Sequence, residues 1–142
     1  MYQLIQFAGN HPWLVSATAL TLVLLIVFEL RLRQADFAAV SPQDVIRLSN
    51  SGALLLDLRK PEEYAAGHIA GARRIDTTEI LKAGDTLKKH REKPVVVYCD
   101  SGSLGASAAR ILSSQGFTKA VNLRGGLGTW RAESLPLVKD GR

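Results

Sequence analysis

Residues 95–109 read VVVYCDSGSLGASAA, the clearest strand–loop–helix pattern of the chain. Its first four residues are apolar and favour β-structure, which predicts a short strand buried on both faces. A loop of small residues follows, and residues 105–114 predict a helix that ends at Gly116. Cys99, the only cysteine of the chain, stands where the strand ends and the loop begins.

Further strands and helices are predicted to alternate on both sides of this stretch. The apolar runs that predict strands are residues 37–40 (a short edge strand), 53–57, 72–75 and 120–123. Ser41 as N-cap, Pro42 at the first helical position and Asp44 in the first turn predict a helix that residues 50–52 end. Shorter helical pieces are predicted at residues 77–81, 85–91 and around Trp130.

This alternation predicts one α/β domain with a small, mainly parallel central sheet flanked by helices. Ligands of such sheets bind beyond the carboxyl ends of the strands. Four candidate site residues follow strand ends in this way: Cys99, Asp57, Arg59 and Arg124.

Two readings of Cys99 follow from its position alone. A buried free cysteine is often a small apolar filler. A nucleophilic cysteine instead reacts as the thiolate, so its site must favour negative charge. The small residues of the loop allow backbone N–H groups to turn toward the sulfur, and the next helix directs its positive N-terminal end to the same place.

Two further segments favour the second reading. Residues 57–72, DLRKPEEYAAGHIAGA, match a pattern of D-x-R, then E-[FY], then G-H-I-x-G-[AS]. Residues 123–130, LRGGLGTW, are followed by LPL at 135–137. With Cys99 between them, these segments resemble the signatures of the rhodanese family in the expected order, over roughly residues 37–138. Together with the apolar N-terminal segment, the chain is similar to membrane-anchored, single-domain rhodaneses of bacteria.

The resemblance implies a sulfurtransferase. Cys99 would take a sulfane sulfur from a donor, hold it as a persulfide, and pass it to a thiophilic acceptor. Backbone N–H groups of the loop would surround the outer sulfur; the loop residues are Asp100, Ser101, Gly102, Ser103, Leu104 and Gly105. Ser101 and Ser103 are also candidate donors to the sulfur. No metal and no organic cofactor is implied.

The loop departs from the family pattern in its charge. Family members active on thiosulfate commonly carry a basic residue five places after the cysteine, where this chain has Leu104, and a Ser or Thr often follows where Gly105 stands. Asp100 adds a negative charge beside the sulfur. Arg59 and Arg124 are the expected compensating cations, at a longer range where water and salt screen them. We therefore expect thiosulfate to be a poor donor.

Several other residues are expected to act structurally. Asp57 is expected to bind backbone groups or arginine side chains near the loop, and Arg59 to pair with an acid such as Glu63. In the resembling family the position of His68 stabilises the fold after a short helix. Trp130 is expected in the core.

Two other functions compete with sulfur transfer. Cysteine phosphatases and arsenate reductases bind an oxyanion through Cys-x5-Arg, but Gly105 stands at that arginine position and the next arginine is Arg110. The stronger alternative is a catalytically weak or inactive module that binds partner proteins at the membrane.

The N-terminal segment predicts a membrane anchor. Residues 12–28 carry no charge, and as a helix they span roughly 26 Å, close to the thickness of the hydrocarbon core. A basic n-region and a small-x-small cleavage site, which a secretory signal requires, are missing from the sequence. Arg31 and Arg33 follow the span, so the positive-inside rule places the N-terminus outside and the C-terminal domain in the cytoplasm, on a bacterial inner membrane.

The expected organisation is therefore an anchor at residues 1–33, with the span at about 12–30, and a cytoplasmic domain at residues 34–142. The net charge of +5 arises from 18 basic and 13 acidic residues that are interspersed, which does not favour nucleic-acid binding. A single cysteine excludes an intramolecular disulfide and suits a reducing compartment. The expected partners are the lipid bilayer, a sulfur donor and acceptor, and a membrane protein.

Overall fold

The computed structural model describes residues 1–35 and 37–139. Asp36 and residues 140–142, which belong to the expected domain at residues 34–142, lie outside the described residues. The chain divides into two compact units, Met1–Arg33 and Gln34–Arg142.

The first unit is helical. It contains α1 (Tyr2–Asn10), which the sequence analysis missed, and most of α2 (Pro12–Ala35). The helices are separated at His11 (φ −132°, ψ 61°), because the residue before a proline disfavours helical geometry. Beyond the expected span, α2 continues to Ala35, since residues 29–35 are good helix formers without glycine or proline.

The apolar part of α2 is the one helix in the described residues that is long and apolar enough to cross a membrane. It covers Pro12–Leu30, with a mean hydropathy of 2.2 and no burial against the rest of the chain. The hydroxyls of Ser16, Thr18 and Thr21 each donate to the carbonyl four residues earlier at 2.9 Å. Length and composition alone also suit a signal sequence.

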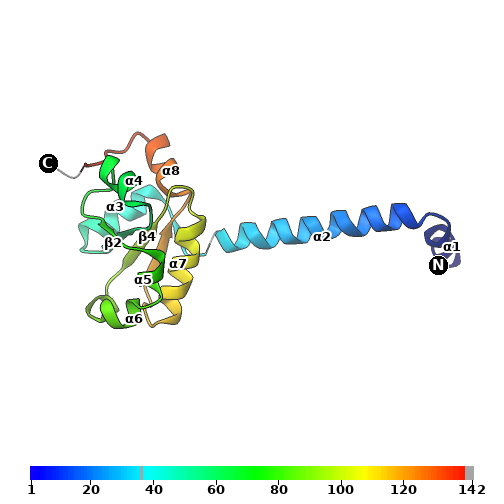
Figure 1. Ribbon diagram of the computed structural model, residues 1–142, viewed down its shortest axis with the longest axis horizontal. Helices are drawn as coiled ribbons and strands as arrows, with labels where there is room; N and C mark the ends of the chain where they lie inside the picture. Colours follow the sequence, from blue (N-terminus) through cyan, green and yellow to red (C-terminus); the bar gives the residue numbers. More distant parts are fainter. Residues whose placement is uncertain (36, 140–142) are drawn as a thin grey trace. The chain divides into compact units, whose positions relative to one another are not determined.

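The second unit is a five-stranded, wholly parallel sheet with helices on both faces (Figure 1). The strand order is β1-β5-β4-β2-β3, with β1 (Ala39–Val40), β2 (Leu54–Asp57), β3 (Arg73–Arg74), β4 (Val95–Tyr98) and β5 (Ala120–Leu123). The helices are α3 (Pro42–Asn50), α4 (Pro61–Ala66), α5 (Thr77–Ile80), α6 (Ala83–Thr86), the 3-10 helix η1 (Lys88–His90), α7 (Ser103–Ser114) and α8 (Gly126–Ala132). The predicted α/β architecture is confirmed.

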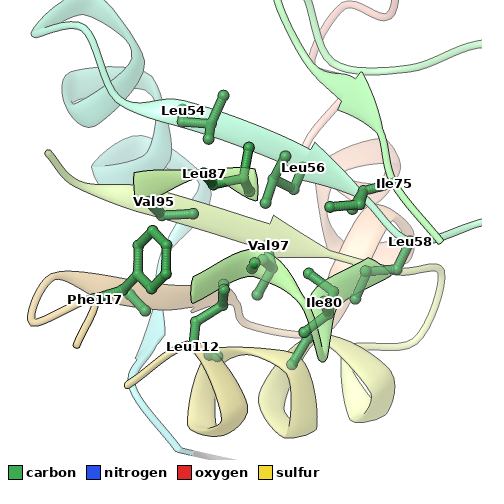
Figure 2. Packing of buried hydrophobic residues seen from close by; sticks show 14 of the residues in the cluster. Leu54, Leu56, Leu58, Ile75, Ile80, Leu87, Val95, Val97, Leu112 and Phe117 are labelled. Atoms are coloured by element: carbon green, nitrogen blue, oxygen red, sulfur yellow. The ribbon is translucent and has the colours of Figure 1, made fainter. Parts of the chain in front are cut away.

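The sheet is covered on both faces because each central strand has apolar side chains in both directions. On one face Leu54, Leu56, Val95 and Val97 pack against α5, α6 and α7 (Figure 2). The opposite face packs against α3 and α8 in a second cluster. The core therefore consists of two apolar layers on either side of one rigid sheet, which holds the strand ends in fixed positions.

The local signals account for the start of α3. Ser41 is its N-cap in extended geometry, its hydroxyl oxygen accepts from the Asp44 N–H at 3.2 Å, and Pro42 opens the helix, as expected. The hydrogen bonds from Ser41, the largest cause, lower the pKa of Asp44.

Candidate functional site

Cys99 follows β4 directly and lies at the carboxyl edge of the sheet. Its side chain is buried, with 3% exposure, and its Sγ accepts a hydrogen bond from the Gly102 N–H at 3.0 Å. Gly102 has φ +95°, which turns this N–H toward the sulfur and starts α7 at Ser103, two residues earlier than predicted. A backbone donor aimed at the sulfur stabilises negative charge on it.

The start of α8 fixes the other side of the loop. The Leu127 N–H donates to the Cys99 carbonyl at 2.8 Å, and the Gly128 N–H donates to the Asp100 carbonyl at 3.0 Å. Gly126 has φ +61°, and a Cβ at this position would lie 2.5 Å from the Cys99 carbonyl oxygen. Gly125 and Gly126, the paired glycines of residues 123–130, thus allow α8 to approach the cysteine loop.

Asn122, on β5, binds the loop that follows Cys99, and it was not predicted as a site residue. Its side chain is fully buried, and its Nδ2 donates to the Gly102 carbonyl at 3.2 Å. A Cβ added at Gly105 would overlap Asn122 Oδ1, so Gly105 makes room for this amide. The sequence signal that could have identified Asn122 is that it is the polar residue within the otherwise apolar run of β5.

A cavity of about 200 Å³ opens at Cys99. Its lining residues are Leu58, Arg59, Lys60, Glu63, Cys99, Asp100, Ser101, Ser103 and Leu104. The parallel pairing of β2 with β4 brings the two halves of this lining together, since the Leu58 N–H donates to the Tyr98 carbonyl at 3.0 Å. Lys60 and Glu63 were not predicted as site residues.

Asp57 and Arg59 form a buried ion pair beside the cavity. Arg59 Nη2 lies 2.6 Å from Asp57 Oδ2, and a second Arg59 hydrogen bond reaches the Gly67 carbonyl at 2.7 Å. Burial opposes the charge of Arg59, but the hydrogen bonds and attraction to Asp57 outweigh it and raise the pKa of the guanidinium. Asp57 thus binds an arginine side chain as expected, and Arg59 pairs with an acid, but the acid is Asp57 and not Glu63, whose carboxylate accepts the Lys60 N–H at the start of α4.

Asp100 also has a cationic partner that the sequence analysis missed. Arg131 Nη1, on α8, lies 3.3 Å from Asp100 Oδ1, and both side chains are more than half exposed. Arg124, the other cation expected to compensate at longer range, is not among the residues that line the cavity, and its guanidinium donates to the Ala39 carbonyl at 3.3 Å.

The remaining candidates lie around the loop or in the core. The hydroxyls of Ser101 and Ser103 lie 3.2 Å apart and bond to each other. His68 is buried, stacks on Tyr64 at 3.8 Å between ring centroids, and is not part of the cavity lining. Trp130 is in the core, where its Nε1–H donates to the Pro136 carbonyl at 3.0 Å.

Two further chemistries can be compared with this geometry. The arginine nearest after the cysteine, Arg110, lies with its guanidinium carbon 5.0 Å from the centre of the Phe37 ring and does not line the cavity, so it supplies no phosphate clamp. Within residues 1–35 and 37–139, no group of three or more His, Cys, Asp or Glu side chains is placed to hold a metal ion.

Comparisons with known proteins agree on one family. The model of the rhodanese-like domain matches residues 41–133. The uncharacterised protein YibN of Escherichia coli is 34% identical over 142 residues, which cover 98% of this chain and 99% of YibN. The thiosulfate sulfurtransferase GlpE of Pseudomonas aeruginosa is 35% identical over 99 residues, covering 68% of this chain and 86% of GlpE. The solved structure of the human single-domain sulfurtransferase TSTD1 has a TM-score of 0.57 and 32% identity, covering 68% of this chain and 96% of its own.

Proposed function

Because the chain belongs to the rhodanese-like domain family, we propose that it is a sulfurtransferase that carries sulfane sulfur as a persulfide on Cys99. The observation that carries this proposal is the hydrogen bond from the Gly102 N–H to Cys99 Sγ at 3.0 Å. A nucleophilic cysteine reacts as the thiolate, and this donor favours negative charge on the sulfur.

The reaction has two displacements. In the first, the Cys99 thiolate attacks the sulfane sulfur of a donor, and the bond between that sulfur and the rest of the donor breaks, with its electron pair leaving on the donor fragment. In the second, an acceptor thiolate attacks the outer sulfur of the persulfide and Cys99 leaves as the thiolate. The loop of residues 100–105 surrounds the outer sulfur, and no metal or organic cofactor takes part.

Thiosulfate is a poor donor in this proposal because the cavity lining offers it no net positive charge. The lining contains two cations, Arg59 and Lys60, and two carboxylates, Glu63 and Asp100. Arg59 is already paired with Asp57, and the position five places after the cysteine is apolar Leu104. A cation at about 4 Å from the dianion would contribute about 4 kcal/mol per charge at an effective dielectric of about 20.

The experiment for this step introduces the missing cation. In Leu104→Arg, we expect kcat/KM for thiosulfate to rise by at least about tenfold, which corresponds to roughly 1.4 kcal/mol of transition-state stabilisation. Leu104→Met, which adds no charge, is the matched control. If the unmodified chain already has a kcat/KM for thiosulfate equal to that of Leu104→Arg, the charge argument is contradicted.

The persulfide itself is tested by intact-mass spectrometry of the full chain. After incubation with glutathione persulfide, we expect a gain of about 32 Da that cyanide removes and that Cys99→Ser lacks. If the folded chain gains no sulfur from glutathione persulfide or thiosulfate, the alternative function, a protein-interaction module at the membrane, takes its place. The 3% exposure of Cys99 is the observation that favours this alternative.

The N-terminal helix is proposed to anchor the domain in the bacterial inner membrane as a single pass, with the N-terminus outside. The support is the uncharged stretch of α2, the return of its hydroxyl hydrogen bonds to the helix backbone, and the arginines that follow in the sequence. The relative YibN matches over this segment as well. In this topology the anchor comprises residues 1–33 and the cytoplasmic domain comprises residues 34–142.

Topology is tested with fusions of the full chain. Green fluorescent protein at the C-terminus should fluoresce, and the fusion should stay in the membrane pellet after alkaline carbonate extraction. A processed, soluble product in the periplasm would show a signal sequence and overturn the anchor.

A further inference from the structure

A second, apolar cavity lies next to the Cys99 cavity. It has a volume of about 150 Å³ and is lined by Thr77, Ile80, Leu104, Ser107, Ala108 and Ile111. The first two residues belong to α5 and the others to α7, so the groove runs between these two helices. Leu104 lines both cavities and therefore joins the groove to the cavity at the sulfur.

The lining of this groove carries no ionisable group. Four of its side chains are purely apolar and two end in a hydroxyl. Leu104 is 53% exposed, and in the second unit only two other large apolar side chains among the described residues, Leu81 and Val138, are comparably exposed. A half-exposed leucine leaves apolar surface in contact with water, and a ligand that covered this surface would gain the free energy of its burial.

We propose that this groove binds the organic group of the sulfur donor, so that the preferred donors carry their sulfane sulfur on a small apolar alkyl or aryl group. This inference rests on the proposed function, since it concerns the donor of the same cysteine. Leu104 is the specificity-determining residue, because it forms the wall that the donor's organic group contacts first.

The dimensions favour a group of a few carbon atoms. In an α-helix each residue rises about 1.5 Å, so Ala108 lies about 6 Å and Ile111 about 10 Å along α7 from Leu104. A chain of four carbon atoms therefore reaches the level of Ala108. A cavity of about 150 Å³ is smaller than drug-sized sites, which are roughly 300–1,000 Å³, so a peptide helix does not fit within it.

The reaction balances with donors whose organic group can be varied. An alkanethiosulfonate, R–SO₂–S⁻, transfers its terminal sulfur to the Cys99 thiolate: a Cys99 S–S bond forms, the S–S bond of the donor breaks, and R–SO₂⁻ leaves with the electron pair. The alkanethiosulfonates from methane to hexane all release a sulfinate and differ only in the length of R.

The experiment measures kcat/KM for sulfur loading of the full chain in nanodiscs with this series. We expect kcat/KM to rise roughly threefold per added methylene up to about four carbons, as each methylene leaves water. In Leu104→Ala and Ile111→Ala the dependence on length should weaken. Leu81→Ala removes an exposed leucine that does not line the groove and should keep the full dependence. These variants also control for partition of the longer donors into lipid.

Two results would overturn the inference. Loading with equal kcat/KM across the series would leave the sulfurtransferase intact and refute the groove as a donor site. The same length dependence in Leu104→Ala as in the unmodified chain would assign the trend to lipid partition and refute it too. If glutathione persulfide loads Cys99 but no thiosulfonate does, the inference fails and the proposed function stands; if neither kind of donor loads Cys99, both fail.

Discussion

The contact between α8 and the cysteine loop makes Gly126→Ala the most informative single substitution. Gly126 has φ +61°, and its added Cβ would lie 2.5 Å from the Cys99 carbonyl oxygen and 2.7 Å from both the Asp100 carbonyl oxygen and the Gly102 nitrogen. All three are backbone atoms, so no side-chain rotation relieves the contact. The loop must move away from α8.

The cost follows from two contributions. The left-handed conformation costs a non-glycine residue about 1–2 kcal/mol. Carbon atoms normally approach other heavy atoms to roughly 3.5 Å, so the loop must shift by about 1 Å, which breaks the hydrogen bonds that Leu127 and Gly128 donate to it. Each contributes about 1 kcal/mol, which gives a total of about 3–4 kcal/mol. The Gly102 N–H then no longer faces Cys99 Sγ, and sulfur loading should be lost.

Gly52→Ala is the matched control. Gly52 also has a left-handed φ, +90°, but an added Cβ meets no atom within 4 Å. We expect a loss of about 1–2 kcal/mol from the backbone conformation alone and unchanged sulfur loading. Urea unfolding gives both free energies, and intact-mass spectrometry gives the loading. If Gly126→Ala loses no more stability than Gly52→Ala and still loads sulfur at the unmodified rate, the account of this contact is refuted.

Two other substitutions test the surroundings of the site, and a third tests the pH dependence of stability. Arg59→Met leaves the fully buried Asp57 carboxylate unpaired and should cost about 3–5 kcal/mol in urea unfolding; a variant as stable as the unmodified chain would contradict the buried pair. Asn122→Ala removes the side chain that donates to the Gly102 carbonyl, so the rate of sulfur loading should fall by about tenfold, equivalent to roughly 1.4 kcal/mol. Urea unfolding is measured in parallel, and an unchanged loading rate would show that Asn122 does not position the loop. Burial and neighbouring cations lower the pKa of His90 below 6.5, so the His90 ring binds a proton less readily in the folded chain than in the unfolded chain. The free energy of unfolding should therefore fall as the pH drops from 6.5 toward the folded pKa. His90→Gln should flatten that dependence, and an identical pH profile in the variant would exclude His90 as its source.

The sequence predicted the fold well because its signals were local. The strands at 53–57, 95–98 and 120–123 appear within one residue of the expected bounds, since continuous apolar runs are what a sheet covered on both faces requires. The cap of α3 also rests on neighbouring residues. The start of α7 was misplaced because the φ of Gly102 depends on how α8 packs against the loop.

The site was harder to predict because its partners come from distant parts of the chain. Asp100 and Arg131 are 31 residues apart, and only the packing of α8 brings them together. A position at a strand end predicts the edge of the sheet but not the direction of a side chain. Arg124 was therefore named as a candidate site residue from its strand-end position, although its guanidinium bonds to the backbone of β1 and does not line the cavity.

One labelled single turnover tests whether Cys99 passes a sulfur atom from donor to acceptor. The full chain is loaded with a donor whose sulfane sulfur is ³⁴S, freed of excess donor, and mixed with a thiol acceptor. We expect Cys99 to carry the label as a gain of about 34 Da, and the label then to appear in the acceptor persulfide as the protein returns to its original mass. A label that never enters the protein, or that also loads Cys99→Ser, would contradict it.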